Sequence, residues 1–211
     1  DSRYEKALQS FVSSVYSDPV LMDDLGSFVK VVECAGRINS LSQTLLKLTA
    51  PGVPDIYQGC ELWDLSLVDP DNRRPVDYTL RRELLEKVRT MNEQEVLLDM
   101  DSGSPKLWLT HRALGLRRMM PEVFGEKASY EPLEMYGPKS EYAFGFVRND
   151  TVAVVVPRLV LKCGGSWGDT EAGELEGTWK NVFSERKHRG PRIRLGEVLE
   201  RFPVALMIKE S

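Results

Sequence analysis

Residues 49–78 constrain the fold of this chain more than any other stretch, because they are dense in residues that disfavour regular structure. The stretch holds four prolines, at positions 51, 54, 70 and 75, and two glycines, at positions 52 and 59. A short apolar run, Val53 to Tyr57, lies between Pro51-Gly52 and Gly59. Such a run, with β-branched residues and turn residues on both sides, is typical of one buried strand. We therefore predict a strand near residues 53–58.

A long polar loop, residues 59–78, follows the predicted strand. It carries several acidic residues, and its only basic residues are Arg73 and Arg74. Loops of this length inside a compact domain are usually either functional or disordered. Trp63, with the leucines and prolines of the same segment, favours an ordered loop. The sequence therefore points to this loop as a functional segment.

Composition excludes several classes of protein. The 211 residues include 28 basic and 32 acidic side chains, a net charge of −4, so no basic excess suggests a nucleic-acid partner. The apolar runs are far shorter than the roughly 20 residues that a membrane span needs. Three widely spaced cysteines and only two histidines predict neither a disulfide framework nor a metal site. Free cysteines also favour a reducing compartment, and we predict a cytoplasmic location.

Apolar residues recur at helical spacing over most of the first half of the chain. The pattern predicts helices over 4–17, 20–33 and 38–48 before the strand, and over 80–91 and 107–120 after the loop.

Capping residues predict where several of these helices begin. Asp18-Pro19 and Ser104-Pro105 are typical of a cap followed by the first helical residue, and Thr79 is a candidate cap after the loop. Gly36 is a candidate helix break, or a site of close packing. The mixed charges of residues 81–95 predict a solvated helix face, and His111 is interpreted as a packing residue on an apolar helix face.

The periodicity changes near residue 129, where short β-rich runs replace the helical pattern. Residues 142–147 and 152–156 flank Asn149-Asp150, which predicts a hairpin turn. Further strands are expected over 179–183, 193–195 and 204–208. The sequence thus predicts an α+β chain whose first part, 1–128, is helical, and whose second part, 129–211, is an antiparallel β domain.

The motifs of the opening stretch resemble the eighth barrel strand and following loop of the alpha-amylase family. In that family the strand has the pattern G-x-P-x-x-Y-x-G-x-E and the loop has D-P-x-x-R-R-P. The matching residues are Gly52, Pro54, Tyr57, Gly59, Glu61, Asp69, Pro70, Arg73, Arg74 and Pro75.

Residues 40–58 and 66–77 are more similar to one branch of that family, the maltooligosyl trehalose synthases. The resemblance continues through 106–118, 154–159 and 202–206, so it covers essentially the whole chain. Motifs of this length are far more specific than an isolated glycine pattern.

The resemblance implies a fold and an activity. Residues 1–128 would be the last helices and the eighth strand of a (β/α)8 barrel, and 129–211 the C-terminal β-sandwich. The rest of the barrel, in the same polypeptide, would be the partner of this chain. The implied reaction is intramolecular transglycosylation of a malto-oligosaccharide, which moves its terminal glucose from an α-1,4 to an α-1,1 link through a covalent intermediate. No cofactor is implied.

The same resemblance implies substrate-binding residues in the loop and the strand. Asp69 and Arg73 would hold the donor sugar, because a carboxylate accepts two hydroxyl bonds and a guanidinium donates in a fixed fork. A structural salt bridge between them is the alternative. Tyr57 and Gln58 end the strand and would face the cleft, unless they only pack in the barrel. Trp63 could stack on a sugar face, although loop packing is favoured for it.

No catalytic residue is predicted in this chain. The family's nucleophile motif, G-x-R-x-D, does not occur in it, and the catalytic acids are expected upstream of Asp1. The chain alone is therefore expected to be inactive. Two alternatives remain open at this point: another hydrolase or transferase of the alpha-amylase family, or a stand-alone carbohydrate-binding module.

Overall fold

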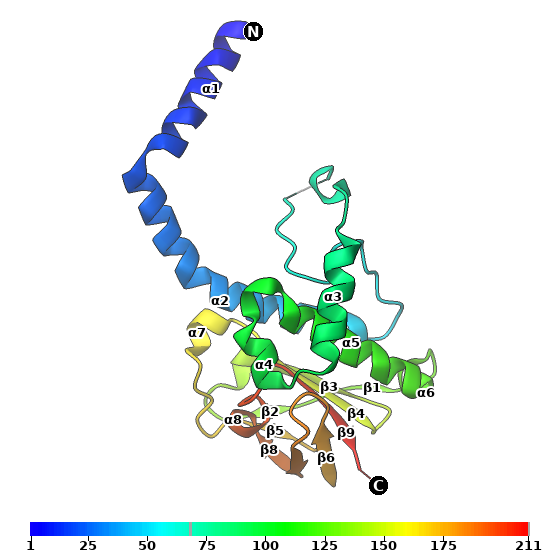
Figure 1. Cartoon of the computed structure of the whole chain (residues 1–211). Helices are drawn as coiled ribbons and strands as arrows, with labels where there is room; N and C mark the ends of the chain where they lie inside the picture. The colour runs from blue at the N-terminus through cyan, green and yellow to red at the C-terminus, as the bar shows by residue number, and fades with distance from the viewer. Residues whose placement is uncertain (68, 211) are drawn as a thin grey trace. The chain divides into compact units, whose positions relative to one another are not determined.

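The computed structural model of the chain describes residues 1–67 and 69–210. It has the predicted α+β composition, with helices first and antiparallel strands after them (Figure 1). Contacts divide the chain into two compact units, Asp1–Arg37 and Ile38–Ser211. The division falls inside a helix rather than at the change from helix to strand near residue 129.

The first unit is purely helical. It consists of α1 (Ser2–Ser17) and the first part of α2 (Pro19–Thr49). Asp18 lies between the two helices. Its carboxylate accepts hydrogen bonds from the amides of Val20 at 3.0 Å and Leu21 at 3.2 Å, and so caps the start of α2. The predicted Asp18-Pro19 helix start is therefore correct.

The predicted break near Gly36 is wrong, because α2 runs through it without interruption. One glycine inside a helix costs only about 1 kcal/mol relative to alanine. A side chain built at Gly36 would meet nothing within 4 Å, so no close neighbour requires the helix to change course there.

The apolar stripe of the first unit is exposed. Phe11 is 65% exposed, Phe28 is 64% exposed, and Leu8 and Leu25 lie on the same pattern and are also exposed. An amphipathic helix normally buries its apolar face. In the described chain these side chains therefore gain little from burial.

The second unit begins with the last turns of α2 and continues into four further helices. These are α3 (Tyr78–Arg89), α4 (Glu93–Leu98), α5 (Ser104–Met119) and α6 (Pro121–Phe124). The 3-10 helices η1 (Asp71–Arg73) and η2 (Met100–Ser102) lie in the connections. None of the described helices combines the length and the apolar character that a membrane crossing requires.

Helix α3 begins two residues earlier than predicted. Its cap is Asp77, whose carboxylate accepts a 2.9 Å bond from the amide of Leu80, and not Thr79. A carboxylate is the stronger acceptor for the free amides of a first helical turn. Helix α4 was not predicted, although its capping box of Asn92 and Glu95 is visible in the sequence.

The strands form two antiparallel sheets. The larger has the order β1 (Tyr130–Pro132), β3 (Ala143–Arg148), β4 (Val152–Pro157), β9 (Ala205–Lys209), β6 (Thr178–Asn181), β7 (Lys187–Arg189). The smaller has the order β2 (Met135–Tyr136), β5 (Glu171–Gly173), β8 (Arg192–Arg194). The short helices η3 (Ser140–Tyr142), α7 (Val160–Cys163) and α8 (Leu195–Val198) connect them.

The predicted hairpin at Asn149-Asp150 joins β3 to β4. Both turn residues have positive φ, 52° and 50°, and the amide of Thr151 donates to the carbonyl of Arg148 at 3.0 Å. These are the features of a type I′ turn, which matches the twist of the strands that it joins.

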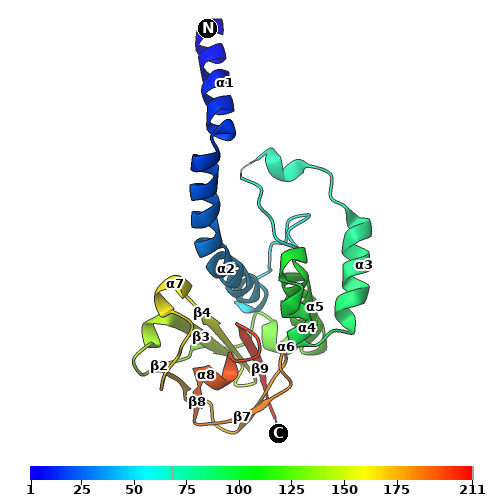
Figure 2. The same ribbon diagram turned by 60° about the vertical axis from the view of Figure 1, so that its left-hand side comes forward.

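The larger sheet is covered on both faces, so all six residues of β4 are buried. Val152, Val154 and Val156 belong to a core shared with the helices, while Ala153 and Val155 belong to a core shared with the smaller sheet. This alternation follows from the two-residue period of a strand. Figure 2 shows the strands beside α5 and α6 on one side and α8 on the other.

The predicted strand at residues 53–58 does not form in this chain. Val53 is 96% exposed and Ile56 is 38% exposed, so the apolar run is not buried either. A parallel barrel strand needs neighbouring strands to pair its backbone groups. Every described strand belongs to one of the two antiparallel sheets, so none is available as a neighbour.

Candidate functional site

The segment that leads to the candidate loop begins at the C-terminal end of α2. Two arginines fix this helix end in place. Arg117 of α5 donates to the carbonyl of Leu48 at 2.8 Å, and Arg148 of β3 donates to that of Thr49 at 2.9 Å. Basic side chains at a helix C-terminus satisfy carbonyls that have no partner within the helix. Thr49 is fully buried and Arg148 is 1% exposed, so the last turn of α2 is held inside the core.

A lysine and a tryptophan hold the first part of the loop. The buried amine of Lys106 on α5 donates to the carbonyl of Leu62 at 3.0 Å, and burial lowers the pKa of this amine. The indole nitrogen of Trp63 donates to the carbonyl of Met100 at 2.6 Å, and its ring packs on the core. The chain at residues 62–63 is therefore fixed against α5 and η2.

Arg81 on α3 connects the two ends of the loop. Its guanidinium donates to the carboxylate of Glu61 at 3.0 Å, to the carbonyl of Gly59 at 2.8 Å and to that of Asp77 at 3.1 Å. Only 18% of the Arg81 side chain is exposed, so the interpretation of residues 81–95 as a solvated face is wrong at this position. The position of Arg81, four residues after the helix cap Asp77, is the sequence feature that could have indicated this role.

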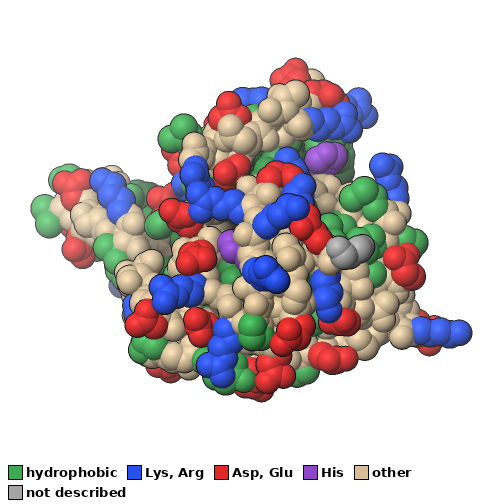
Figure 3. Space-filling model, turned by 90° about the horizontal axis from the view of Figure 1, so that it is seen from below, with side chains coloured by type: hydrophobic (Ala, Val, Ile, Leu, Met, Phe, Trp, Pro, Cys, Tyr) green, Lys and Arg blue, Asp and Glu red, His purple; other side chains and the backbone are tan. Residues whose placement is uncertain are grey.

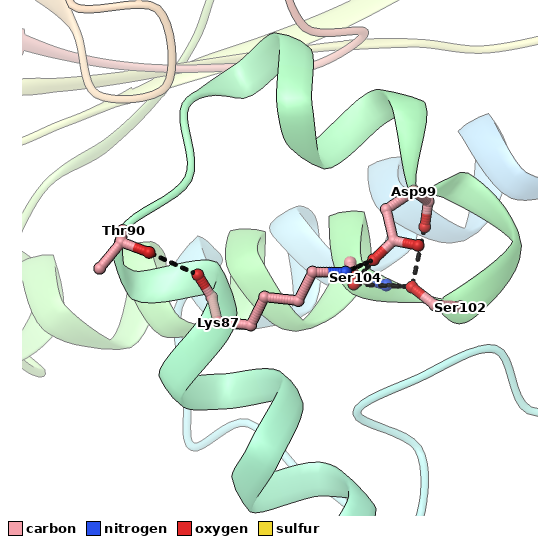
Figure 4. Close-up of polar contacts among 5 residues, drawn as sticks. All are labelled: Lys87, Thr90, Asp99, Ser102 and Ser104. Carbon is pink, nitrogen blue, oxygen red and sulfur yellow. Dashed lines mark hydrogen bonds and ion pairs between the residues drawn. The ribbon is translucent and has the colours of Figure 1, made fainter.

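Helices α3 and α5 are themselves joined by a polar cluster, which Figure 4 shows. The carboxylate of Asp99 accepts bonds from the amine of Lys87 at 2.9 Å and from the hydroxyl of Ser104 at 2.7 Å. Lys87 and then Ser104 lower the pKa of Asp99, because both stabilise the carboxylate. This cluster fixes the relative position of the helices that carry Arg81 and Lys106.

A hollow of about 170 Å³ opens between the loop and the start of α3. It is smaller than the roughly 300–1,000 Å³ of complete ligand sites, so it can be only part of one. Its lining is mostly polar and comes from Gln58, Gly59, Trp63, Asp64, Ser66, Asp71, Asn72, Arg74, Pro75, Val76, Asp77 and Arg81.

Two acceptors of the hollow have no hydrogen-bond donor among the described residues. They are the Oδ1 atoms of Asp71 and Asn72, both shielded from solvent. Asp71 forms an ion pair with Arg74, but without hydrogen-bond geometry at this oxygen. Shielded acceptors without donors are unfavourable, and hydroxyl groups of a ligand are one way to satisfy them.

The structure brings together only some of the predicted site residues. Gln58 and Trp63 line the hollow. Asp69 and Arg73 form an ion pair with each other, with side chains 53% and 66% exposed, and neither lines the hollow. Tyr57 is 48% exposed and also lies outside the lining.

Three residues were not selected as site residues from the sequence. Asn72 and Arg74 line the hollow, and Arg81 holds the loop. Among the described residues no cluster of three or more potential ligand side chains could hold a metal ion.

Comparisons with known proteins cover the whole chain. Two proteins of Mycobacterium tuberculosis strains that are assigned as maltooligosyl trehalose synthases are 33% identical to it over 211 residues. The solved maltooligosyltrehalose synthase from Arthrobacter ramosus has 36% identity and a TM-score of 0.86 over 100% of this chain. A second solved maltooligosyl trehalose synthase has 26% identity and a TM-score of 0.78. No family model matches the chain.

The resemblance to maltooligosyl trehalose synthases is confirmed. The chain spans about a quarter of the length of these relatives, 25% of the M. tuberculosis proteins and 27% of the A. ramosus structure. The part that it matches is their C-terminal region. The similarity to maltooligosyl trehalose synthases therefore concerns a region and not a whole enzyme.

Arg81 provides a direct test of how the loop is held. Arg81→Met keeps the aliphatic stem but leaves Glu61 and the Gly59 carbonyl without their donor. We expect the free energy of unfolding in urea to fall by about 1–3 kcal/mol, and proteolysis within residues 59–77 to become faster.

The matched control is Arg82→Met, since Arg82 is the next residue of α3 and is exposed. It should change the free energy of unfolding by less than about 0.5 kcal/mol. Equal effects of the two substitutions would show that Arg81 does not hold the loop.

Proposed function

We propose that this chain is the C-terminal part of an enzyme that converts malto-oligosaccharides by intramolecular transglycosylation, in trehalose biosynthesis. The observation that carries the proposal is similarity over the full chain to maltooligosyl trehalose synthases, at 33% identity in the M. tuberculosis proteins and 36% in the A. ramosus structure. In the reaction, the α-1,4 bond at the terminal glucose breaks and an α-1,1 bond to the new reducing end forms. No atoms are gained or lost.

The chemistry requires carboxyl groups that we assign to the preceding part of the polypeptide. One carboxylate would attack the anomeric carbon, and a carboxylic acid would protonate the departing oxygen. The anomeric hydroxyl of the released terminal glucose would then attack the covalent intermediate and displace the carboxylate. The present chain would supply sugar contacts and exclude water, and would be inactive alone.

Asp69 and Arg73 are the residues that we assign to the donor sugar. Their mutual ion pair fixes both side chains near the ends of η1 before substrate binds. A carboxylate already held by a guanidinium keeps free lone pairs for two sugar hydroxyls, and the guanidinium keeps free N–H groups. Fixing both groups in advance lowers the entropy cost of binding.

The hollow beside η1 is assigned to the same site. Gln58, Trp63 and Asn72 line it, and the unpaired Oδ1 of Asn72 would accept a sugar hydroxyl. Tyr57, at the end of the segment that precedes the loop, would close this wall. A closed pocket matters for the proposed reaction, because water would otherwise capture the covalent intermediate.

The remaining part of the barrel is the partner that we propose for residues 1–128. It would cover the exposed apolar stripe of α1 and α2, and would supply the strands that residues 53–58 need. Residues 129–211 would form the C-terminal β-sandwich. The three cysteines are free, which favours the reducing environment of the cytoplasm.

The activity can be tested by a change in reducing ends. We expect the longer polypeptide that contains this chain to remove reducing ends from maltopentaose, since the α-1,1 product has none. The 211-residue chain alone should leave them unchanged. An increase with the longer polypeptide would instead identify a hydrolase, and turnover by the isolated chain would contradict the assignment of the acids upstream.

The binding roles of Asp69 and Arg73 can be separated from a structural role. In the longer polypeptide, Asp69→Ala and Arg73→Ala should each lower kcat/KM by roughly 10- to 100-fold, as expected for about 1–3 kcal/mol of lost transition-state binding. Hydrolysis should also rise relative to transfer. Exposed ion pairs contribute at most about 1 kcal/mol to folding, so stability should change little.

The control is Arg186→Ala, which removes another exposed ion pair, that with Glu200 in the β domain. It should leave kcat/KM unchanged. Unchanged kinetics in folded Asp69 and Arg73 variants would remove both residues from the site.

A further inference from the structure

A second, larger hollow lies between helices and the larger sheet, at the other end of α3 from the loop. Its volume is about 410 Å³, within the range of small-molecule sites. It is bordered by the end of α3, by one side of α5 and by strands β6 and β9. Its charged and titratable lining residues are Arg89, His111, Arg112, Arg118, Lys180 and Glu185.

The lining carries a strong excess of positive charge, with four cations and one carboxylate. Glu185 is shared by Arg112, at 3.4 Å, and Lys180. Arg89 pairs outside the lining with Glu86 at 2.6 Å, and Arg118 has no carboxylate partner in the described part of the chain. Over the face that Figure 3 shows, basic and acidic side chains are interspersed.

The guanidinium of Arg112 is held in a fixed orientation. It lies over the ring of Trp108, 4.7 Å from its centroid, and donates to the carbonyl of Val182 at 3.3 Å. A stacked guanidinium loses less conformational entropy when it binds an anion than a mobile side chain does. The orientation of this cation is therefore set before a ligand binds.

The positive charges of the hollow affect the pKa of His111. Burial lowers the pKa of His111, and Arg89, Arg112 and Arg118 lower it further. Glu86 acts in the opposite direction and raises this pKa. The three arginines line the hollow together with His111, and their positive charge disfavours the charged imidazole. His111 is an exposed residue that lines the hollow.

We propose that this hollow binds a small phosphorylated molecule, with its phosphate against Arg89, Arg112 and Arg118. Guanidinium groups match the geometry of phosphate oxygens, and a dianion offsets more of the positive excess than a carboxylate does. The uncharged body of the ligand would lie against Val182 and Ile208, two of the apolar residues of the lining. This inference does not depend on the proposed function.

Gly115 offers a way to fill the hollow without disturbing the core. It lies within α5, lines the hollow, and a side chain built on it would meet nothing within 4 Å. Gly115→Leu would therefore place an apolar group in the ligand's space. Because glycine inside a helix is unfavourable by about 1 kcal/mol, the substitution should not weaken the helix.

The test uses the histidine signals of the chain, of which there are two. The C2 proton of His111 would be titrated by NMR in phenyl phosphate, and in sodium chloride at equal ionic strength. A bound dianion near the imidazole should raise the pKa of His111 by about one unit. His188 is the internal reference: it is buried on β7 opposite Trp179, on the other face of the sheet from Lys180.

Three substitutions decide the result. Arg118→Gln should weaken binding at least about tenfold, which is roughly 1.4 kcal/mol. Gly115→Leu should abolish the phenyl phosphate effect and leave the fold intact. Arg82→Gln, an exposed arginine of α3 outside the hollow, should have no effect.

Two results would overturn the proposal. One is an equal His111 titration in phenyl phosphate and in chloride. The other is an equal loss of the effect in Arg118→Gln and Arg82→Gln, which would indicate general screening instead of a site.

Discussion

The hydrogen bonds from Arg148 and Arg117 to the end of α2 are the interactions on which the rest of the second unit depends. Arg148 is almost fully buried and has no carboxylate partner among the residues that the structure describes; it donates to the carbonyls of Thr49 and Ser129. A buried cation is costly unless its donors are satisfied, so its position leaves little freedom to the backbone around it. Through these bonds one side chain of the sheet fixes a helix end and the start of β1.

The loop depends on that fixed helix end and on the two helices that follow it. Lys106 and Arg81 hold its carbonyls, and Asp99 holds α3 to α5, so much of residues 59–77 has defined polar partners. Two features of the stretch lack partners among the described residues. The Oδ1 of Asn72 in the hollow accepts no hydrogen bond, and the apolar side chains of Val53 and Ile56 are exposed. Both concern the same stretch, and the apolar stripe of α1 and α2 is exposed as well. Under the proposed function, the preceding part of the polypeptide would cover the exposed residues.

The sequence predicted the elements whose causes are local. Asn149-Asp150 specifies its turn through backbone conformation alone, and Asp18-Pro19 specifies a helix start. The sequence did not predict the features that depend on partners distant in the chain. Residues 53–58 have the composition of a buried strand, but strand pairing requires neighbouring strands. Arg81 resembled a solvated residue because its partners lie up to 22 residues away in the sequence. The polar hollow was missed for the same reason, since η1 brings Asp71, Asn72 and Arg74 to Gln58 and Trp63 only in the folded chain.

The central claim is that residues 53–58 are irregular here because their neighbours are missing, and that a longer polypeptide converts them into a strand. Amide hydrogen exchange at Ile56, Tyr57 and Gln58 measures this directly. We expect exchange near the unfolded rate in the 211-residue chain, and exchange slowed by at least roughly 100-fold in the longer polypeptide, where the amides would be paired inside a sheet. Equally fast exchange in both proteins would contradict the account.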